Sequence, residues 1–155
     1  GAARFRDVDS TPLVVGETVI AASFSGGVWA VDAATGERRW HHEIEGVTSL
    51  TESEAGVVGA GLDGEVVWLD PVDGGVRFAI TLDAASPGAP VPHGEVVLVP
   101  THDAGLFVLD GRAPWIHHRF DPSAGFDAPP VPRGGRVYAL SRAGFLYGLD
   151  LVVSD

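Results

Sequence analysis

Residues 26–40 read Gly-Gly-Val-Trp-Ala-Val-Asp-Ala-Ala-Thr-Gly-Glu-Arg-Arg-Trp, and the rest of the chain is built from weaker copies of this stretch. Its first part is a short apolar run ending at Asp32, which predicts a β-strand. The Asp side chain can hold the following turn by accepting backbone N–H bonds, and Gly36 supplies a positive φ that other residues adopt at a cost. Trp40 then offers a large apolar face to a neighbouring sheet. The stretch therefore reads as a strand, a turn and an aromatic anchor.

The strand part of this stretch recurs four times. A small residue, any residue, Val or Leu, an apolar residue, any residue, and Val or Leu precede the aspartates Asp32, Asp70, Asp110 and Asp150. These aspartates are 38, 40 and 40 residues apart. A second mark lies 20 residues before each of them, at Pro12, Leu50, Pro90 and Pro130. A period of about 40 residues with internal β patterning indicates a propeller or another solenoid-like array.

Each unit carries the signals of short strands separated by turns. In the first unit the strands are predicted at 13–15, 18–22, 28–31 and 38–44. Four antiparallel strands form one propeller blade. We therefore predict an all-β propeller in a single domain, residues 1–155, with repeats at about 10–47, 48–85, 86–124 and 125–155.

The two ends of the chain leave the size of the ring open. After Asp150 only five residues remain, so the fourth strand of the last blade is expected to be missing or truncated. Residues 3–8 lie where the outer strand of an earlier blade belongs, and residues 1–9 are predicted as an outer closing strand. If they pair with the strand that begins at Gly144, the chain closes as a small four-bladed ring. If not, it is an arc, such as half of an eight-bladed ring, completed by a second copy or cut from a longer polypeptide.

Composition supports a folded β protein and excludes some functions. Hydrophobic residues make up 45% and charged residues 20% of the chain, which has 21 Gly and 11 Pro. Ten basic residues, all Arg, face 21 acidic ones, giving a net charge of −11. Nucleic acid is therefore not an expected partner, because phosphate binding needs a basic stripe. There is no Cys for a disulfide or thiolate metal site, and no apolar run approaches the roughly 20 residues of a transmembrane segment.

The stretch Asp32-Ala-Ala-Thr-Gly36 followed by Trp40 resembles the PQQ-like β-propeller repeat, the tryptophan-docking repeat found in quinoprotein dehydrogenases and in the outer-membrane assembly lipoprotein BamB. The resemblance weakens along the chain. Phe78 stands in place of Trp in the second copy, and in the third Trp115 arrives three residues early. The WD-type repeat fits less well, because the chain has no Gly-His dipeptide and no Trp-Asp pair.

The resemblance to quinoprotein dehydrogenases raises the question of whether this chain has the residues that hold their quinone and calcium. Those enzymes bind the quinone over a Trp floor with a calcium held by Asp, Glu and Asn oxygens, and often carry a vicinal disulfide. This chain has no Asn and no Cys. We therefore predict no catalytic, cofactor or metal residues and expect a non-catalytic protein-interaction scaffold, BamB-like or like extracellular sensor propellers, in the periplasm or outside the cell. The alternatives are a fragment of a PQQ-dependent dehydrogenase and a propeller that binds a small ligand or glycan.

Candidate site residues lie in turns and not in the repeated stretch. The pairs His41-His42 and His117-His118 fall on fourth strands, where adjacent residues face opposite sides, so neither pair can chelate one ion. The turns between the second and third strands differ in chemistry from blade to blade. They supply the predicted partner-binding residues Ser25, Asp63, His102, Asp103 and Arg142. Unconstrained loop variation would give the same diversity, so both readings stay open. The expected partner is another protein or a second copy of the chain.

Overall fold

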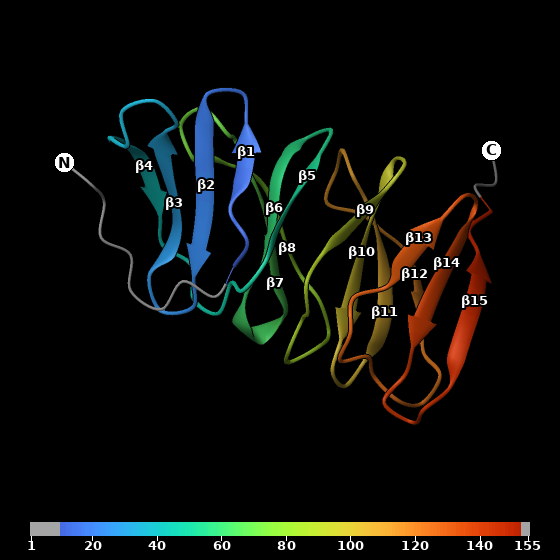
Figure 1. The fold of residues 1–155 in the computed structure, drawn as a ribbon. Helices are drawn as coiled ribbons and strands as arrows, with labels where there is room; N and C mark the ends of the chain where they lie inside the picture. The colour runs from blue at the N-terminus through green and yellow to red at the C-terminus, as the bar shows by residue number, and fades with distance from the viewer. Residues whose placement is uncertain (1–9, 153–155) are drawn as a thin grey trace.

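A computed structural model describes residues 10–152, and the predicted closing strand at residues 1–9 lies outside this range. The described residues form four antiparallel sheets that follow one another along the chain as four blades. Figure 1 shows them side by side, with the N-terminal blade at one end and the C-terminal blade at the other. The prediction of an all-β propeller is confirmed.

The first two blades are complete four-stranded sheets whose strands pair in sequence order. Blade 1 consists of β1 (Leu13–Val15), β2 (Thr18–Ser23), β3 (Gly27–Asp32) and β4 (Arg38–His42). Blade 2 consists of β5 (Leu50–Ser53), β6 (Gly56–Ala60), β7 (Glu65–Leu69) and β8 (Val76–Thr81), with the short 3-10 turn η1 (Leu62–Gly64) between β6 and β7. The strands agree closely with those expected from the pattern around Asp32.

Blade 3 is also complete, whereas blade 4 has three strands. Blade 3 consists of β9 (Val91–His93), β10 (Val96–Thr101), β11 (Gly105–Asp110) and β12 (Ile116–Phe120). Blade 4 consists of β13 (Val131–Arg133), β14 (Arg136–Leu140) and β15 (Leu146–Asp150). Within residues 10–152 no strand pairs with the outer edge of β15, as expected from the short end of the fourth repeat.

The core lies between the blades, because each inner blade is covered on both faces. Alternate residues of a strand point to opposite faces, so both sets are apolar where a blade has two neighbours. In β7, for example, Val67 and Leu69 belong to the cluster shared with blade 1, and Val66 and Trp68 to the cluster shared with blade 3. A third cluster joins blades 3 and 4. Stacking of blades is therefore what buries the apolar surface.

The blades form an open arc and not a closed four-bladed ring. Contacts between first strands run from β1 to β5 and from β5 to β9. Blade 4 ends the series with a face that exposes Leu140 and Leu146, so no described residue covers it. Of the two arrangements expected from the sequence, the structure shows the arc, as Figure 1 illustrates. No helix in the described part of the chain is long and apolar enough to span a membrane.

Candidate functional site

The turns that follow Asp32, Asp70 and Asp110 lie on one side of the arc, where the third strands of the blades end. This side is here called the Asp rim. The Asp32 carboxylate accepts the N–H groups of Ala34 and Thr35, both at 2.9 Å, and its other oxygen accepts a hydrogen bond from Arg39 at 2.6 Å. Blade 2 repeats this with Asp70, Val72 and Arg77. In blade 3 Asp110 accepts from Arg112 and Ala113, and His117 takes the place of the arginine. In these three blades the side chain that contacts the aspartate therefore stands seven residues after it.

These contacts favour the charged carboxylates. The Arg39 guanidinium and the N–H groups of Thr35 and Ala34 hold the pKa of Asp32 well below its ordinary value. The N–H of Val72 and the side chain of Arg77 lower the pKa of Asp70. The oxygens of each carboxylate thus accept hydrogen bonds from groups of their own blade, which is a structural role.

Trp40 docks blade 1 onto the Asp turn of blade 2. Its indole N–H donates to the Pro71 carbonyl at 3.0 Å, and only 7% of the side chain is exposed. The ring also lies against Gly74, where a Cβ would come within 2.5 Å of a ring carbon. Gly74 has φ of 74°, so glycine is required here both for the turn and for the approach of the ring.

The docking position changes along the arc. Trp40 pairs with Ala30 across the sheet, Phe78 pairs with Trp68, and His118 pairs with Val108. The docking position of blade 3 is therefore held by His118. Trp115, read from the sequence as a displaced docking residue, is not its equivalent: it lies in the turn before β12 with 66% of its surface exposed. Counting eight residues from each aspartate would have identified His118.

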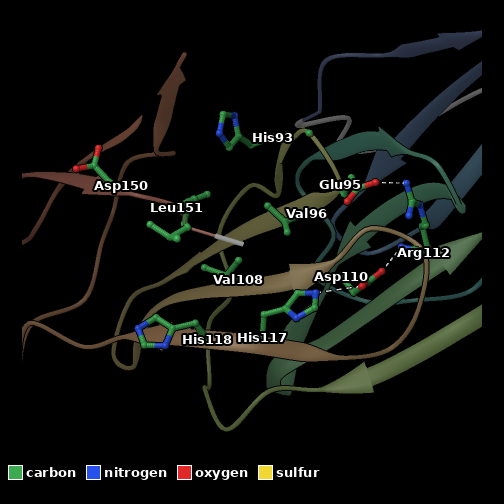
Figure 2. Close-up of a pocket in the computed structure, with 12 residues that line it drawn as sticks. His93, Glu95, Val96, Val108, Asp110, Arg112, His117, His118, Asp150 and Leu151 are labelled. Carbon is green, nitrogen blue, oxygen red and sulfur yellow. Dashed lines mark hydrogen bonds and ion pairs between the residues drawn. The ribbon is translucent and has the colours of Figure 1, made fainter. Parts of the chain in front are cut away.

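An open pocket of about 750 Å³ lies between blades 3 and 4, next to this position. Figure 2 shows Val96 and Val108 from blade 3 facing Leu151, with charged side chains around them. Arg112 makes ion pairs with Glu54 and Glu95, so it ties the pocket to blade 2. The pocket was not predicted from the sequence, and His118 lines it at the register position that Trp40 has in blade 1.

The predicted partner-binding residues all lie on the opposite side of the arc, at the other ends of the strands. This side is here called the turn rim. This rim consists of the turns β2–β3, β6–β7, β10–β11 and β14–β15, which point the same way in Figure 1. The five predicted residues are exposed: Ser25, Asp63, His102, Asp103 and Arg142. Asp63 has φ of 57°, an uncommon conformation for a residue other than Gly.

Backbone hydrogen bonds join the turns of the turn rim into one strip. In the linker between blades 1 and 2, the N–H of Gly46 donates to the carbonyl of Phe24 in the turn of blade 1, at 2.7 Å. The carbonyl of Glu45 in the same linker accepts from the N–H of Leu62 in the turn of blade 2, at 3.0 Å. The linker between blades 2 and 3 accepts at Ser86 O from His102, at 3.1 Å. The third linker accepts at Gly125 O from Arg142, at 2.9 Å. Each linker is therefore bonded to neighbouring turns, which fixes the spacing of their side chains.

The turns of blades 3 and 4 are brought together by Asp127, which sequence reasoning missed. His102 Nδ1 lies 2.7 Å from one Asp127 oxygen, and Arg142 Nε lies 3.3 Å from the other. The linker reaches this place because Gly125 has no side chain, since a Cβ there would lie 1.8 Å from the His102 carbonyl oxygen. Asp103 lies in the same turn as His102, whereas Ser25 and Asp63 belong to other blades. Nothing in the repeat pattern marks Asp127.

The described residues do not fit a quinone cofactor with its calcium. Within residues 10–152 no three His, Asp or Glu side chains are grouped to hold a metal ion. His41 stacks on Trp29 with ring centroids 3.8 Å apart, and His117 contacts Asp110. The chain also has no Asn. The donor chemistry that the resemblance to quinoprotein dehydrogenases implies is thus not assembled in this arc.

Four stacked antiparallel sheets, an Asp turn in each of blades 1 to 3 and the docked Trp40 define the chain as a PQQ-like β-propeller arc. The family model described as outer membrane protein assembly factor BamB matches residues 1–59 and 52–152, and the chain belongs to this family. BamB of Escherichia coli (strain K12) is 26% identical over 151 residues, which cover 94% of this chain and 38% of that protein. The chain thus spans well under half the length of this relative.

Two solved structures show the same fold. BamB from Moraxella catarrhalis superposes with a TM-score of 0.78 at 21% identity, covering 92% of this chain and 50% of that one. The computationally designed Ika4 protein superposes with a TM-score of 0.81 at 16% identity, covering 98% and 96% of the two chains. At these identities the similarity concerns the fold alone.

Proposed function

We propose that the chain is a non-catalytic scaffold that binds a protein partner through the turn rim. The observation that carries this proposal is the contrast between the two rims. At the Asp rim the carboxylates of Asp32 and Asp70 are hydrogen-bonded within their own blades. At the turn rim, exposed side chains of differing chemistry stand on a strip held rigid by backbone bonds. A rigid scaffold that presents variable loops is a common way to build a binding surface.

Within the turn rim, the best candidate for the binding site is the cluster of His102, Asp103, Asp127 and Arg142. It combines both charge signs within two adjacent turns and a linker, and the side chains of His102, Asp127 and Arg142 are about half exposed. Such groups can pair with charged side chains and backbone groups of a polypeptide, and they set orientation and association rate more than affinity. The chain's net charge of −11 favours a partner surface that is basic overall.

Membership of this family supports a proposal about the cellular process and the compartment. The relatives are named as factors in the assembly of outer membrane proteins. We infer that this chain works in the same process, and hence in the periplasm, with an outer membrane protein or a component of its assembly apparatus as partner.

Site-specific photocrosslinking tests this proposal. A benzophenone amino acid is placed at Ser25, Asp63, Asp103 or Arg142, and at Glu37 and Val72 as exposed controls on the Asp rim. The variants are directed to the periplasm of Escherichia coli, and adducts are identified by mass spectrometry. We expect one recurrent adduct, an outer membrane protein or assembly component, from turn-rim positions only. Equal adducts from both rims, or none from the turn rim, would contradict the proposal.

A further inference from the structure

The exposed face of blade 4 has the same apolar design as faces that are buried elsewhere in the arc. In blades 1 to 3 the face directed to the next blade carries two cross-strand pairs: Ile20 with Ala30 and Ala22 with Val28, Val58 with Trp68 and Ala60 with Val66, Leu98 with Val108 and Pro100 with Leu106. The corresponding pairs in blade 4 are Tyr138 with Gly148 and Leu140 with Leu146. The pattern of a covered blade therefore continues into the last blade.

Burial is the property that changes. Ile20, Val58 and Leu98 are fully buried, whereas Tyr138, at the same position, is 38% exposed. Leu140 and Leu146 are 51% and 69% exposed, and Val131 on the inner strand is 62% exposed. Apolar patches of this kind on a soluble protein mark an interaction surface.

The other end of the arc presents the complementary face. Each later blade turns one set of residues toward the blade before it, such as Val57, Gly59, Val67 and Leu69 in blade 2. The same register positions in blade 1 are Val19, Ala21, Trp29 and Val31. Three of these are only partly buried: Val19, Trp29 and Val31. Blade 1 thus carries a receiving face of partly buried apolar side chains, with His41 stacked on Trp29, and blade 4 carries an apolar donating face.

We propose that the two faces are joined between two copies of this chain, with blade 4 of each copy packed on blade 1 of the other. The contact continues the series of blade-to-blade interfaces already present three times within one chain. A head-to-tail contact closes into a ring only when the rotation fits a whole number of copies. The solved BamB chain from Moraxella catarrhalis has this arc as half of its length, which fits closure by two copies. The inference does not depend on partner binding at the turn rim.

Sedimentation velocity tests the proposal. The wild-type chain is expected to sediment at twice its 16.1 kDa mass. Leu140→Glu with Leu146→Glu should reduce the mass to one copy, while the circular dichroism spectrum stays unchanged because both side chains are already exposed in the single chain. The control Val72→Glu with Val76→Glu adds the same charge at exposed positions of blade 2 and should leave the mass doubled.

A mixing experiment gives the direction of the contact. Val19→Arg on the receiving face should also yield a single copy. Mixed with the Leu140→Glu, Leu146→Glu chain, it should recover the doubled mass, because one interface is then wild type and the other pairs Arg with Glu. A wild-type chain that stays at one copy at 100 μM, an open series of larger masses, or a mixture that fails to associate would each overturn the two-copy ring.

Discussion

Two blade-to-blade contacts in the same molecule differ at the docking position and in how closely it is packed. Between blades 1 and 2, the ring of Trp40 lies on Gly74 and donates to the Pro71 carbonyl. Between blades 3 and 4, the same register position is His118, and an open pocket lies beside it. Both docking residues follow an Asp turn of their own blade, and the two turns have the same hydrogen-bond pattern. The turn and the docking residue are therefore separable devices.

This difference shows which part of the repeat tolerates change. The Asp turn is satisfied locally by groups two, three and seven residues along the chain, so it does not depend on the neighbouring blade. The docking residue is useful only if the next blade offers a matching carbonyl and a glycine. In blade 3 the docking residue is therefore replaced while the Asp turn is kept, and an open pocket lies beside the replaced position.

The largest expected effect is on the intact contact. Trp40→Ala should lower the free energy of unfolding by about 3–5 kcal/mol, because it removes a buried indole and leaves a cavity between two sheets. Urea unfolding followed by circular dichroism measures this change. His118→Ala, at the same register position but beside an existing pocket, is the matched control and should cost less than half as much.

Gly74→Ala approaches the same contact from the other blade. The added Cβ overlaps the Trp40 ring and must adopt φ of 74°, so we expect a loss of about 2 kcal/mol in the free energy of unfolding. Gly36→Ala serves as control, since it has φ of 71° but no atom within 4 Å of the new Cβ. Equal losses at the two positions would mean that only backbone conformation matters.

His118→Trp would restore the eroded contact. The larger ring should fill space beside Val108 and place its N–H near the Leu151 carbonyl, the counterpart of Pro71. We expect a gain of about 1 kcal/mol, typical of cavity filling. A differential scanning experiment that shows an unchanged or lower Tm would mean that blade 4 does not offer a docking surface of this kind.

The smallest effect concerns the turn of blade 3. Burial acts to raise the pKa of Asp110, but the N–H of Arg112 and the imidazole of His117 lower it overall. The carboxylate is therefore charged both at pH 5 and at pH 8 in the folded chain. An imidazole is charged only when protonated, whereas a guanidinium stays charged. His117→Arg should thus stabilise by about 0.5 kcal/mol at pH 8 and by less at pH 5. An equal gain at both pH values would argue against the ion pair.

The fold was largely predictable because its signal is local and repeated. Strand, turn and aspartate recur at spacings of 38, 40 and 40 residues, and the strand positions in blade 1 follow directly from them. The lack of a fourth strand in blade 4 within residues 10–152 was also expected from the sequence, which predicts a missing or truncated strand there. Openness of the arc was not decided, because it depends on contacts between distant blades.

The site was only partly predictable. The turns of the turn rim could be located by alignment of the repeats, but not the bridge from Asp127 to His102 and Arg142, which depends on the path of a linker. Trp115 misled the sequence reading because tryptophan was taken as the mark of docking. Position decides instead, since the residue eight after the aspartate faces the next blade whatever its type.

A double-mutant cycle between Trp40 and Gly74 tests the docking account most directly. The cost of Gly74→Ala is measured in the wild type and in the Trp40→Ala background by urea unfolding. If the ring rests on the glycine, the cost should fall by at least about 1 kcal/mol when the ring is absent, leaving the penalty of the positive φ. An identical cost in both backgrounds would contradict the claim that Trp40 joins the two blades by contact with this turn.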